Sequence, residues 1–392
     1  MIDTVVLTID ARDVLIQGPK RFSPSAEVIV SASPAHIGGR GNISAYQNPT
    51  KTELAQGNYK PRLTLSKRLR SGGFSTTLKI EFSAPKLLFG NNFDELEDED
   101  FEKIIDKLDE KLLEMDILVR REVLRNAQVS AIHFSKNIVL PEFVTSSMVI
   151  RELGKIDLNQ RLDLSNTDFR NEGHSLRYHA NSFEITFYDK IKDLEKAKFS
   201  EKRAIEKDNA VQLDLFKDLK PRGLEVLRME VRIGNRTKLK ALLGKVAEPI
   251  EMDFKSLFQM TLSKKILLHY WEKISKDLPC FSIAPRKPEE LVEAICQRGR
   301  IKPLKAAQMA GYFLLIESIG MRGFRALLGN VSNRTWQRLK KEIGTYSKFE
   351  GQKNDLMKEM RRSLVEFLPA RLGLGKALNK DVIGYGYIHR RH

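Results

Sequence analysis

Short runs in which apolar and polar residues alternate limit the fold more than any other feature of the chain. Five such runs occur before about residue 245: DTVVLTI, TTLKIEFS, QVSAIHFS, SFEITFYD and VLRMEVRIG. An alternation with a period of two is typical of a strand with one buried face. Between the second and third runs, an amphipathic pattern predicts one helix over residues 98–124, beginning in an acidic run that suits a helix N-terminus. We expect an α+β fold with an antiparallel sheet.

The second part of the chain has a different pattern. From about residue 250 the strand-like runs vanish and helical patterns dominate, and 392 residues are enough for two domains. We predict an α+β domain over residues 1–245, a helical connector over 246–285 and a mostly helical domain over 286–392 that ends in a basic tail. A further charged helix is expected over residues 195–220.

The net charge indicates the kind of partner. Lys and Arg total 67 against 51 Asp and Glu, a formal charge of +16, which favours nucleic acid or an acidic membrane surface. No run of 18 apolar residues and no leader-like start is present, so neither a membrane span nor a secretory signal is expected. The two cysteines, Cys280 and Cys296, form no CxxC pair, which favours a reducing cytoplasm over a disulfide framework or a zinc site.

The polar faces of the predicted strands carry groups that suit one metal site. Alternation places Glu81, His133 and Glu230 on polar faces. If these strands share one sheet, two carboxylates and an imidazole are available to one divalent cation, Mg²⁺ or Mn²⁺. Arg228 and Arg232 flank Glu230 on the same face and are expected to bind phosphate.

Tyr188 ends one of these strands on its polar face. Only about one phenol in a thousand is ionised at neutral pH, so an attacking tyrosine needs electrostatic help. A metal ion on the phosphate, with Lys190 or Lys192 near the hydroxyl, would supply it. We therefore predict Tyr188, Lys190 and Lys192 as catalytic residues. Tyr178 is a second tyrosine nearby, for which packing is the favoured role.

Residues 302–343 form a different pattern. They predict a helix, a turn around Gly320, a short helix, a break at GNVSN and a last helix capped by Ser332 or Asn333. This order is similar to a helix-turn-helix module that presents a basic helix to duplex DNA. The alternative is a helical bundle with a solvated basic face. The side chains predicted to contact DNA are Arg334, Trp336, Arg338, Lys340 and Lys341.

Six blocks in a fixed order also resemble a known family. They are MIDTVVL, KIEFSAPKLLFGNNFDEL, NAQVSAIHFS, EITFYDKIKDL, LRMEVRI and SNRTWQRLKKEI. Together they resemble the gene II/gene X replication initiators of filamentous bacteriophages and their prophage and plasmid relatives. The resemblance extends over residues 1 to about 345.

The resemblance implies a site-specific nickase that starts rolling-circle replication. Such an enzyme joins a tyrosine to the 5′ phosphate at the nick and later rejoins the displaced strand into a circle, and by match to the family motif Tyr188 would be that tyrosine. One departure is that the two-histidine signature of many rolling-circle nucleases is missing, with His133 alone in IHFS. The implied partners are single- and double-stranded origin DNA and a host polymerase, in the bacterial cytoplasm. Because no GxxxxGK[ST] motif is present, unwinding is expected from a separate host helicase.

Two other classes of protein fit parts of the pattern. A non-catalytic DNA-binding replication regulator would keep the basic surface and tolerate Tyr188→Phe without loss of function. A metal-dependent phosphodiesterase that uses activated water would also tolerate this change, but would lose activity when Glu230 is replaced. The sequence alone leaves these alternatives open beside the strand transferase.

Overall fold

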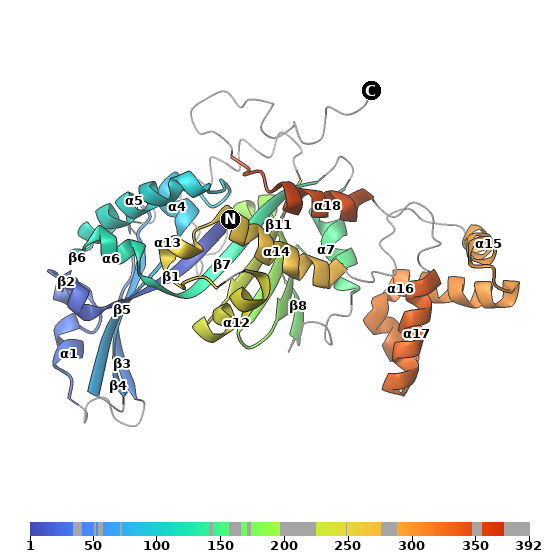
Figure 1. Cartoon of the computed structure of the whole chain (residues 1–392), viewed down its shortest axis with the longest axis horizontal. Coiled ribbons are helices and arrows are strands. Elements are labelled where there is room, and N and C mark those ends of the chain that lie inside the picture. Colours follow the sequence, from blue (N-terminus) through green and yellow to red (C-terminus); the bar gives the residue numbers. More distant parts are fainter. Residues whose placement is uncertain are drawn as a thin grey trace. The chain divides into compact units, whose positions relative to one another are not determined.

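The structure is a computed structural model of the whole chain (Figure 1). The predicted charged helix over 195–220 lies outside the described residues apart from its first two, and so does the basic tail. The described residues are 1–33, 41–50, 52–53, 58–70, 73–140, 144–156, 166–170, 174–196, 225–247, 249–275, 288–346 and 355–371.

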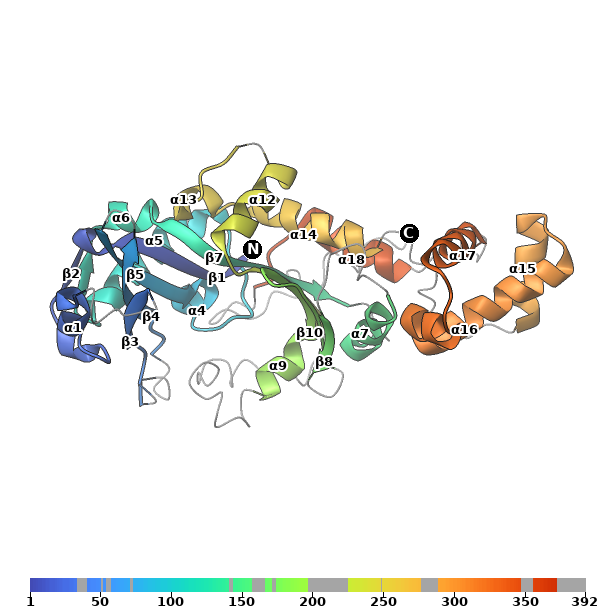
Figure 2. The same ribbon diagram turned by 90° about the horizontal axis from the view of Figure 1, so that it is seen from below.

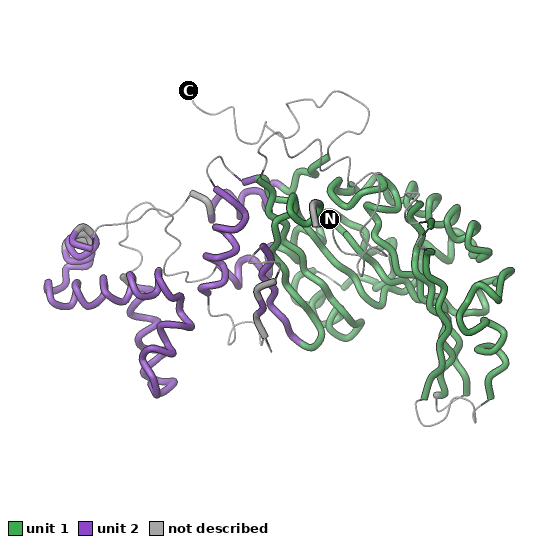
Figure 3. The backbone as a smooth tube through the Cα atoms, turned by 180° about the vertical axis from the view of Figure 1, so that it is seen from behind, with its two compact units in different colours: residues 1–139, 181–267, 367–392 green, residues 140–180, 268–366 purple. Residues whose placement is uncertain are grey.

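The chain divides into two compact units (Figure 3). Unit 1 contains residues 1–139, 181–267 and 367–392, and unit 2 contains 140–180 and 268–366. This division differs from the predicted linear one at residue 245, because a segment between two strands of unit 1 belongs with the later helices. Within unit 2, for example, the backbone N–H of Met321 donates to the carbonyl of Lys155 at 3.0 Å. Such a contact between distant segments leaves no mark on local sequence pattern.

Unit 1 is built on an antiparallel sheet, which together with its helices makes the fold class α+β, as predicted. The strand order within this unit is β3-β4-β5-β1-β7-β11-β10. All five alternating runs form strands of this sheet, whereas β3 and β4 were not predicted. The strands are β1 (Ile2–Asp10), β3 (Asn42–Gln47), β4 (Arg62–Arg70), β5 (Gly73–Ser83), β7 (Gln128–Val139), β10 (Phe183–Asp189) and β11 (Val226–Ile233).

One face of this sheet is the core of unit 1. Leu7, Ile80 and Val231 are fully buried on it. The ring of Phe82 on β5 lies 5.9 Å from that of Phe254 on α13 (Phe254–Leu257), which lies 5.3 Å from Phe101 on α5 (Phe101–Leu113). Figure 2 shows α13 and α12 (Arg236–Val246) on one side of the strands and α9 (Lys190–Lys196) on the other. Because side chains alternate between faces, the polar positions gather on the side away from this core.

The predicted helix over residues 98–124 is broken into four elements. Helix α5 ends at Leu113, and Asp116 has a positive φ of 59°, a conformation that a continuing helix excludes. The carboxylate of Asp116 pairs with Arg21 at 2.8 Å. The apolar residues 117–119, which follow Asp116, form a strand because Ile and Val are β-branched and suit a sheet. The other elements are η4 (Asp98–Asp100), β6 (Ile117–Val119), paired with β2 (Val14–Ile16), and α6 (Arg121–Arg125).

Unit 2 is mainly helical. Its core gathers apolar side chains around the fully buried Trp336 and Phe324. None of the helices in the described ranges is long and apolar enough to cross a membrane. The elements are α7 (Ser146–Gly154), β8 (Asn166–Arg170) paired with β9 (Ser175–His179), α15 (Pro288–Gly299), α16 (Pro303–Leu327), α17 (Asn333–Tyr346) and α18 (Asp355–Glu366), with α14 (Met260–Ser275) shared between the units.

The predicted turn and cap in residues 302–343 are confirmed. Gly320 has φ 72° and ψ 169° and breaks α16 into two helices. A Cβ atom at this position would lie 3.0 Å from the Cα of Lys155. The bend therefore requires glycine both because φ is positive and because the backbone of Lys155 lies so close. The Oγ of Ser332 accepts the N–H of Thr335 at 3.2 Å, which makes it the N-cap of α17.

Candidate active site on the polar face of the sheet

Three neighbouring strands of unit 1 place the predicted catalytic groups side by side. Thr186 of β10 lies opposite Glu230 of β11, and Tyr188 lies opposite Arg228. On its other side, β11 pairs with β7, with Glu230 opposite Ser135. Residues directly opposite or one pair apart on one face are close enough for side-chain contact. The register therefore gathers these side chains on the polar face.

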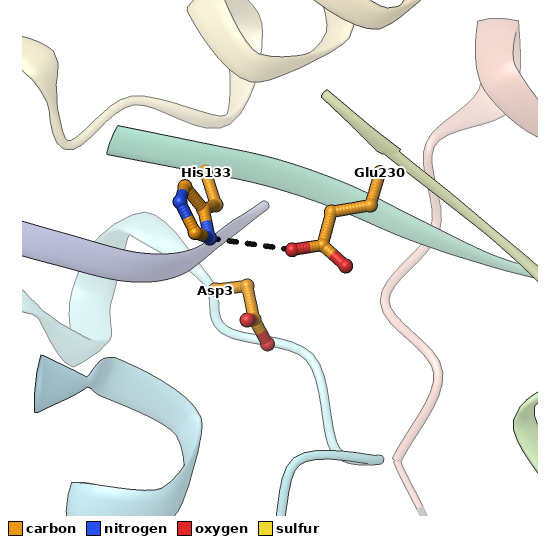
Figure 4. Close-up of side chains that lie close together, drawn as sticks. All are labelled: Asp3, His133 and Glu230. Carbon is orange, nitrogen blue, oxygen red and sulfur yellow. Dashed lines mark ion pairs between the residues drawn. The ribbon is translucent and has the colours of Figure 1, made fainter. Parts of the chain in front are cut away.

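Asp3, His133 and Glu230 form a compact group (Figure 4). One possible ligand atom from each lies within 4.8 Å of the others. The Nδ1 of His133 is 3.3 Å from Oε1 of Glu230. Glu230 is buried, and the other two are half-buried. Two carboxylates and an imidazole are thus available to one cation.

Asp3 reaches this group through an irregularity of β1. Ile2 lies opposite Phe134 while Val5 lies opposite Ile132, so three steps along β1 match two along β7, as in a β-bulge. Both Ile2 and Val5 are buried. A strict alternation would place Asp3 on the same face as Val5, in the core. The signal that could have identified Asp3 is that it is the only charged residue of β1 before Asp10.

Glu81, the third ligand predicted from the sequence, is not a member of this group. It is exposed on β5, opposite Val6 of β1. Because β1 lies between β5 and β7 in the sheet, Glu81 stands one strand farther from His133 than Asp3 does. In the described structure Asp3 takes the place predicted for Glu81.

Arg232 holds Glu230 in its ionised form. Its Nε and Nη2 donate to the two carboxylate oxygens of Glu230 at 2.9 and 3.1 Å, and its Nη1 lies 3.0 Å from Oε1 of Glu184. Burial alone would raise the pKa of Glu230, but Arg232 and His133 outweigh it and hold the pKa well below its usual value. The Arg232 side chain is 32% exposed, so it also faces the solvent from which an anion would arrive.

Arg228, predicted to bind phosphate, instead positions Asp3. It is 1% exposed, and its Nη2 donates to Oδ1 of Asp3 at 2.6 Å and to Oγ of Ser135 at 2.7 Å. Its Nη1 donates to the carbonyl of Asn92 at 2.7 Å and to Oδ1 of Asn137 at 3.3 Å. Both terminal nitrogens are thus engaged beneath the surface, so this guanidinium orients Asp3, whereas Arg232 is the partly exposed arginine of the pair.

Tyr188 lies at the edge of the group formed by Asp3, His133 and Glu230. Its hydroxyl donates to Oε2 of Glu230 at 3.4 Å. Burial raises the pKa of this phenol well above its usual value; Arg228 opposes the rise and Glu230 adds to it. The phenol is therefore neutral at physiological pH, and its proton is directed toward a carboxylate of the group.

The two predicted lysines occupy different environments. Lys190, the first residue of α9, is buried, and its Nζ lies 5.7 Å from the centre of the Tyr188 ring and 3.6 Å from Oδ2 of Asp193. Lys192 is exposed, and its backbone N–H donates to Oδ1 of Asp189 at 2.9 Å. Lys190 is thus the lysine that the structure brings next to Tyr188.

Tyr178, the competing tyrosine, belongs to the core of unit 2. It is fully buried, and its hydroxyl donates to the carbonyl of Leu153 at 2.7 Å. Burial raises the pKa of this phenol above its usual value. The predicted packing role is confirmed.

Helix α17 presents part of its predicted basic face. Arg334, Arg338 and Lys341 are exposed, and their spacing of four and three residues places them on one side of the helix. Lys340 is half-buried. Trp336, predicted to contact DNA, is instead a core residue with no exposed surface, 6.3 Å from the Phe324 ring and 5.5 Å from the Arg325 guanidinium. One tryptophan in an amphipathic helix can lie on its buried side or on its exposed side. The sequence pattern therefore did not show whether Trp336 is a core residue or a surface residue.

Comparisons with known proteins give no match. No protein-family model matches the chain, and neither a curated protein nor a solved structure matches it significantly. The resemblance to the replication initiators therefore rests on the sequence blocks, and the site rests on its geometry.

Proposed function

We propose that the chain is an initiator of rolling-circle DNA replication that nicks one strand at an origin in the bacterial cytoplasm. In this proposal Tyr188 is the nucleophile, and Asp3, His133 and Glu230 hold a divalent cation. The observation that carries the proposal is the hydrogen bond from the Tyr188 hydroxyl to Glu230, because it joins a potential nucleophile to a metal-ligand group on one sheet face.

The three ligands suit Mg²⁺ or Mn²⁺. Metal–ligand distances are about 2.0–2.6 Å, so atoms within 4.8 Å of one another are close enough to share one ion. The low pKa of Glu230 keeps its carboxylate ionised, and Arg228 orients Asp3. When bound, such a cation polarises a phosphate and offsets the charge that develops on it.

The protein's own groups would then act on the scissile phosphate. The Oη of Tyr188 forms a bond to phosphorus while the bond from phosphorus to the 3′ oxygen breaks, which leaves a 5′-phosphotyrosyl ester and a free 3′ hydroxyl. Glu230 orients the phenol through its hydrogen bond. The phenol passes its proton to water as the new bond forms, and the leaving 3′ oxygen takes up a proton from water. Arg232, partly exposed beside the site, is placed to bind a non-bridging oxygen, and Lys190 adds positive charge near the tyrosine.

The reverse reaction would rejoin the strand. A phosphotyrosyl ester retains the energy of the broken phosphodiester, so a 3′ hydroxyl can attack it and release Tyr188 without ATP. The exposed basic side of α17 would bind origin duplex. Unwinding and synthesis are assigned to a host helicase and polymerase.

The test is a search for the covalent adduct. Single-stranded oligonucleotides of random sequence, labelled at the 3′ end, are incubated with the protein and Mg²⁺ or Mn²⁺ and separated on a denaturing gel. We expect the 3′ label to migrate with the protein, whereas a 5′ label is released on a shorter fragment. Mass spectrometry after nuclease digestion should place the nucleotide remnant on Tyr188. Tyr188→Phe should form no adduct, and Tyr178→Phe should form it normally.

Each other outcome rejects the proposal in a distinct way. Cleavage without an adduct, retained in Tyr188→Phe, would favour a phosphodiesterase that uses activated water. DNA binding without cleavage under either metal would favour a replication regulator. An adduct that maps to another tyrosine would reject the assignment of Tyr188.

A further inference from the structure

A second polar surface lies on the same face of the sheet as the candidate active site. Across three strands, Tyr46 of β3 is opposite Thr64 of β4, which is opposite Lys79 of β5. Lys79 shares its face with Glu81, two residues along the strand, and Glu81 lies opposite Val6 of β1. We name the surface formed by Tyr46, Thr64, Arg68 and Lys79 the extension face.

The extension face connects to the active site through the register of β1 and β7. Val6 lies opposite Ala131 of β7. His133 comes two residues after Ala131 on the same strand, so the side chains of Ala131 and His133 point to the same side of the sheet. Three strand steps separate β4 from β7, a span of about 14 Å at about 4.8 Å per step. The register adds an offset along the strands, because Lys79 lies opposite Thr8, and Thr8 lies opposite Gln128, five residues before His133, or about 16 Å at about 3.3 Å per residue. An extended ligand longer than about 20 Å could therefore contact both places.

The opposite side of these strands is closed by the core. Leu63, Leu65 and Leu78 have no exposed surface. Lys67, which shares their side, donates from Nζ to the carbonyls of Val30 and Ala32 at 2.6 and 2.8 Å. At the end of this side, Leu69 and Phe74 lie opposite each other and are 47% and 43% exposed. Among the described residues, the core therefore closes this side along Leu63, Leu65 and Leu78 but not at its end.

The extension face carries cations and an aromatic ring that the protein does not use internally. Tyr46 is 51% exposed, Arg68 is exposed and Lys79 is half-buried. Within the described ranges, the side chains of these three residues make no hydrogen bond or ion pair. On β3, β4, β5 and β1, the described acids on this side are Asp3 of the candidate active site, Glu81, which lies opposite Arg62, and Asp10, which pairs with Arg12 at 2.9 Å. Arg68 and Lys79 thus keep their positive charge for an external anion.

We propose that the extension face binds the single strand of DNA that flanks the phosphate attacked by Tyr188. This inference rests on the proposed function and names its second DNA contact. A positively charged surface with an exposed aromatic ring suits single strands, because phosphates pair with the cations while an unpaired base stacks on the ring. The bases of a duplex are stacked on one another and are not open to Tyr46. Arg68 and Lys79 would contact phosphates, and Tyr46 would stack on a base.

The experiment measures binding of a fluorescein-labelled oligodeoxythymidylate by anisotropy in EDTA, over a series of salt concentrations, with the full-length protein. The variant Arg68→Gln/Lys79→Gln should lower the slope of log affinity against log salt by about 1.4, at about 0.7 for each lost phosphate contact. Tyr46→Leu should bind about tenfold more weakly, and Tyr46→Trp should bind within about twofold of the parent because the stacking surface is kept. Affinity for a labelled duplex should change less than about twofold in all three.

The matched control is Lys103→Gln/Lys107→Gln, which removes two charges from α5 on the core side of the sheet, where Lys103 and Lys107 pair with Asp100 and Glu110. It should leave the slope for the single strand unchanged. The inference is overturned if Arg68→Gln/Lys79→Gln keeps the parental slope, or if its affinities for duplex and single strand fall equally. Because binding in EDTA needs no cleavage, a missing Tyr188 adduct would reject the proposed function without altering this result.

Discussion

Charged side chains are used differently in the two units. On the polar face of unit 1, Glu230 and Arg228 are buried and held by several partners. On α17 of unit 2, Arg334, Arg338 and Lys341 are exposed. Buried charges are weakly screened and strongly dependent on their partners, whereas exposed charges are screened by salt. We therefore expect changes at the buried charges of unit 1 to affect chemistry and folding, and changes on α17 to affect only affinity.

The largest expected effect is the loss of cleavage when a metal ligand is removed. Asp3→Ala, His133→Ala and Glu230→Ala should each lower the nicking rate at saturating Mg²⁺ by about a thousandfold, or about 4 kcal/mol of transition-state stabilisation. Binding of duplex should stay near the parental value. The rate is measured on an oligonucleotide that forms the Tyr188 adduct.

The control for this group is Glu81→Gln. Glu81 is exposed on the same face but stands outside the ligand group, so this variant should nick within about threefold of the parent. Full activity in Asp3→Ala together with loss of activity in Glu81→Gln would restore the ligand set predicted from the sequence.

The next largest effect concerns stability. Arg228→Met should lower the free energy of unfolding of unit 1 by about 3–5 kcal/mol, because Asp3 loses its buried partner. Replacing both partners, in Asp3→Leu/Arg228→Met, should cost less than the sum of the single changes, because neither leaves an unpaired charge. The measurement is urea unfolding of all three variants. Strict additivity would show that the pair is not coupled.

How far the sequence predicts this site depends on the regularity of each strand. Tyr188, His133 and Glu230 follow the alternation of their strands, and the register of β7, β11 and β10 keeps them on one face. Asp3 does not, because the bulge in β1 shifts its side chain by one position. Whether a buried arginine such as Arg228 holds a carboxylate or binds a phosphate depends on tertiary contacts that no local pattern carries.

The fold shows the same limit. Strands with clear alternation were predicted, as was the bend at Gly320, because each depends on local chemistry. The assignment of residues 140–180 to unit 2 was not predicted, because it depends on contacts between segments far apart in the chain. The break after Leu113 was also missed, since helical periodicity continues through a residue whose φ is positive.

A third prediction separates packing from DNA contact in unit 2. Trp336→Ala should destabilise this unit by about 3–5 kcal/mol, because the side chain is fully buried beside Phe324. Trp336→Phe should cost less. Nicking of a single-stranded oligonucleotide should be unchanged in Trp336→Phe, since its site lies in unit 1. Lower duplex affinity with unchanged thermal unfolding would instead support the contact predicted from the sequence.

The smallest expected effect is on salt-dependent affinity. Replacing Arg334, Arg338 and Lys341 with Gln should lower the salt slope of duplex binding by about 0.9 for each phosphate contact, or about 2.7 in total. Stability should change by less than about 0.5 kcal/mol, because all three side chains are exposed. Anisotropy titrations with a labelled duplex at several salt concentrations measure the slope, and thermal unfolding measures the stability.

The matched control for α17 is Arg361→Gln/Arg362→Gln on α18. These arginines are also about half exposed, but they pair with Glu272 and Glu366 at 3.1 and 2.7 Å, so less of their charge is available to phosphate. The control should alter the slope less per residue than the α17 variant does. Equal slopes in the α17 variant and the parent would show that the basic side of α17 is only solvated. In that case the duplex contact would have to be sought elsewhere on the chain, while the proposed nicking of a single strand should be unchanged, since its proposed site is built from residues of unit 1.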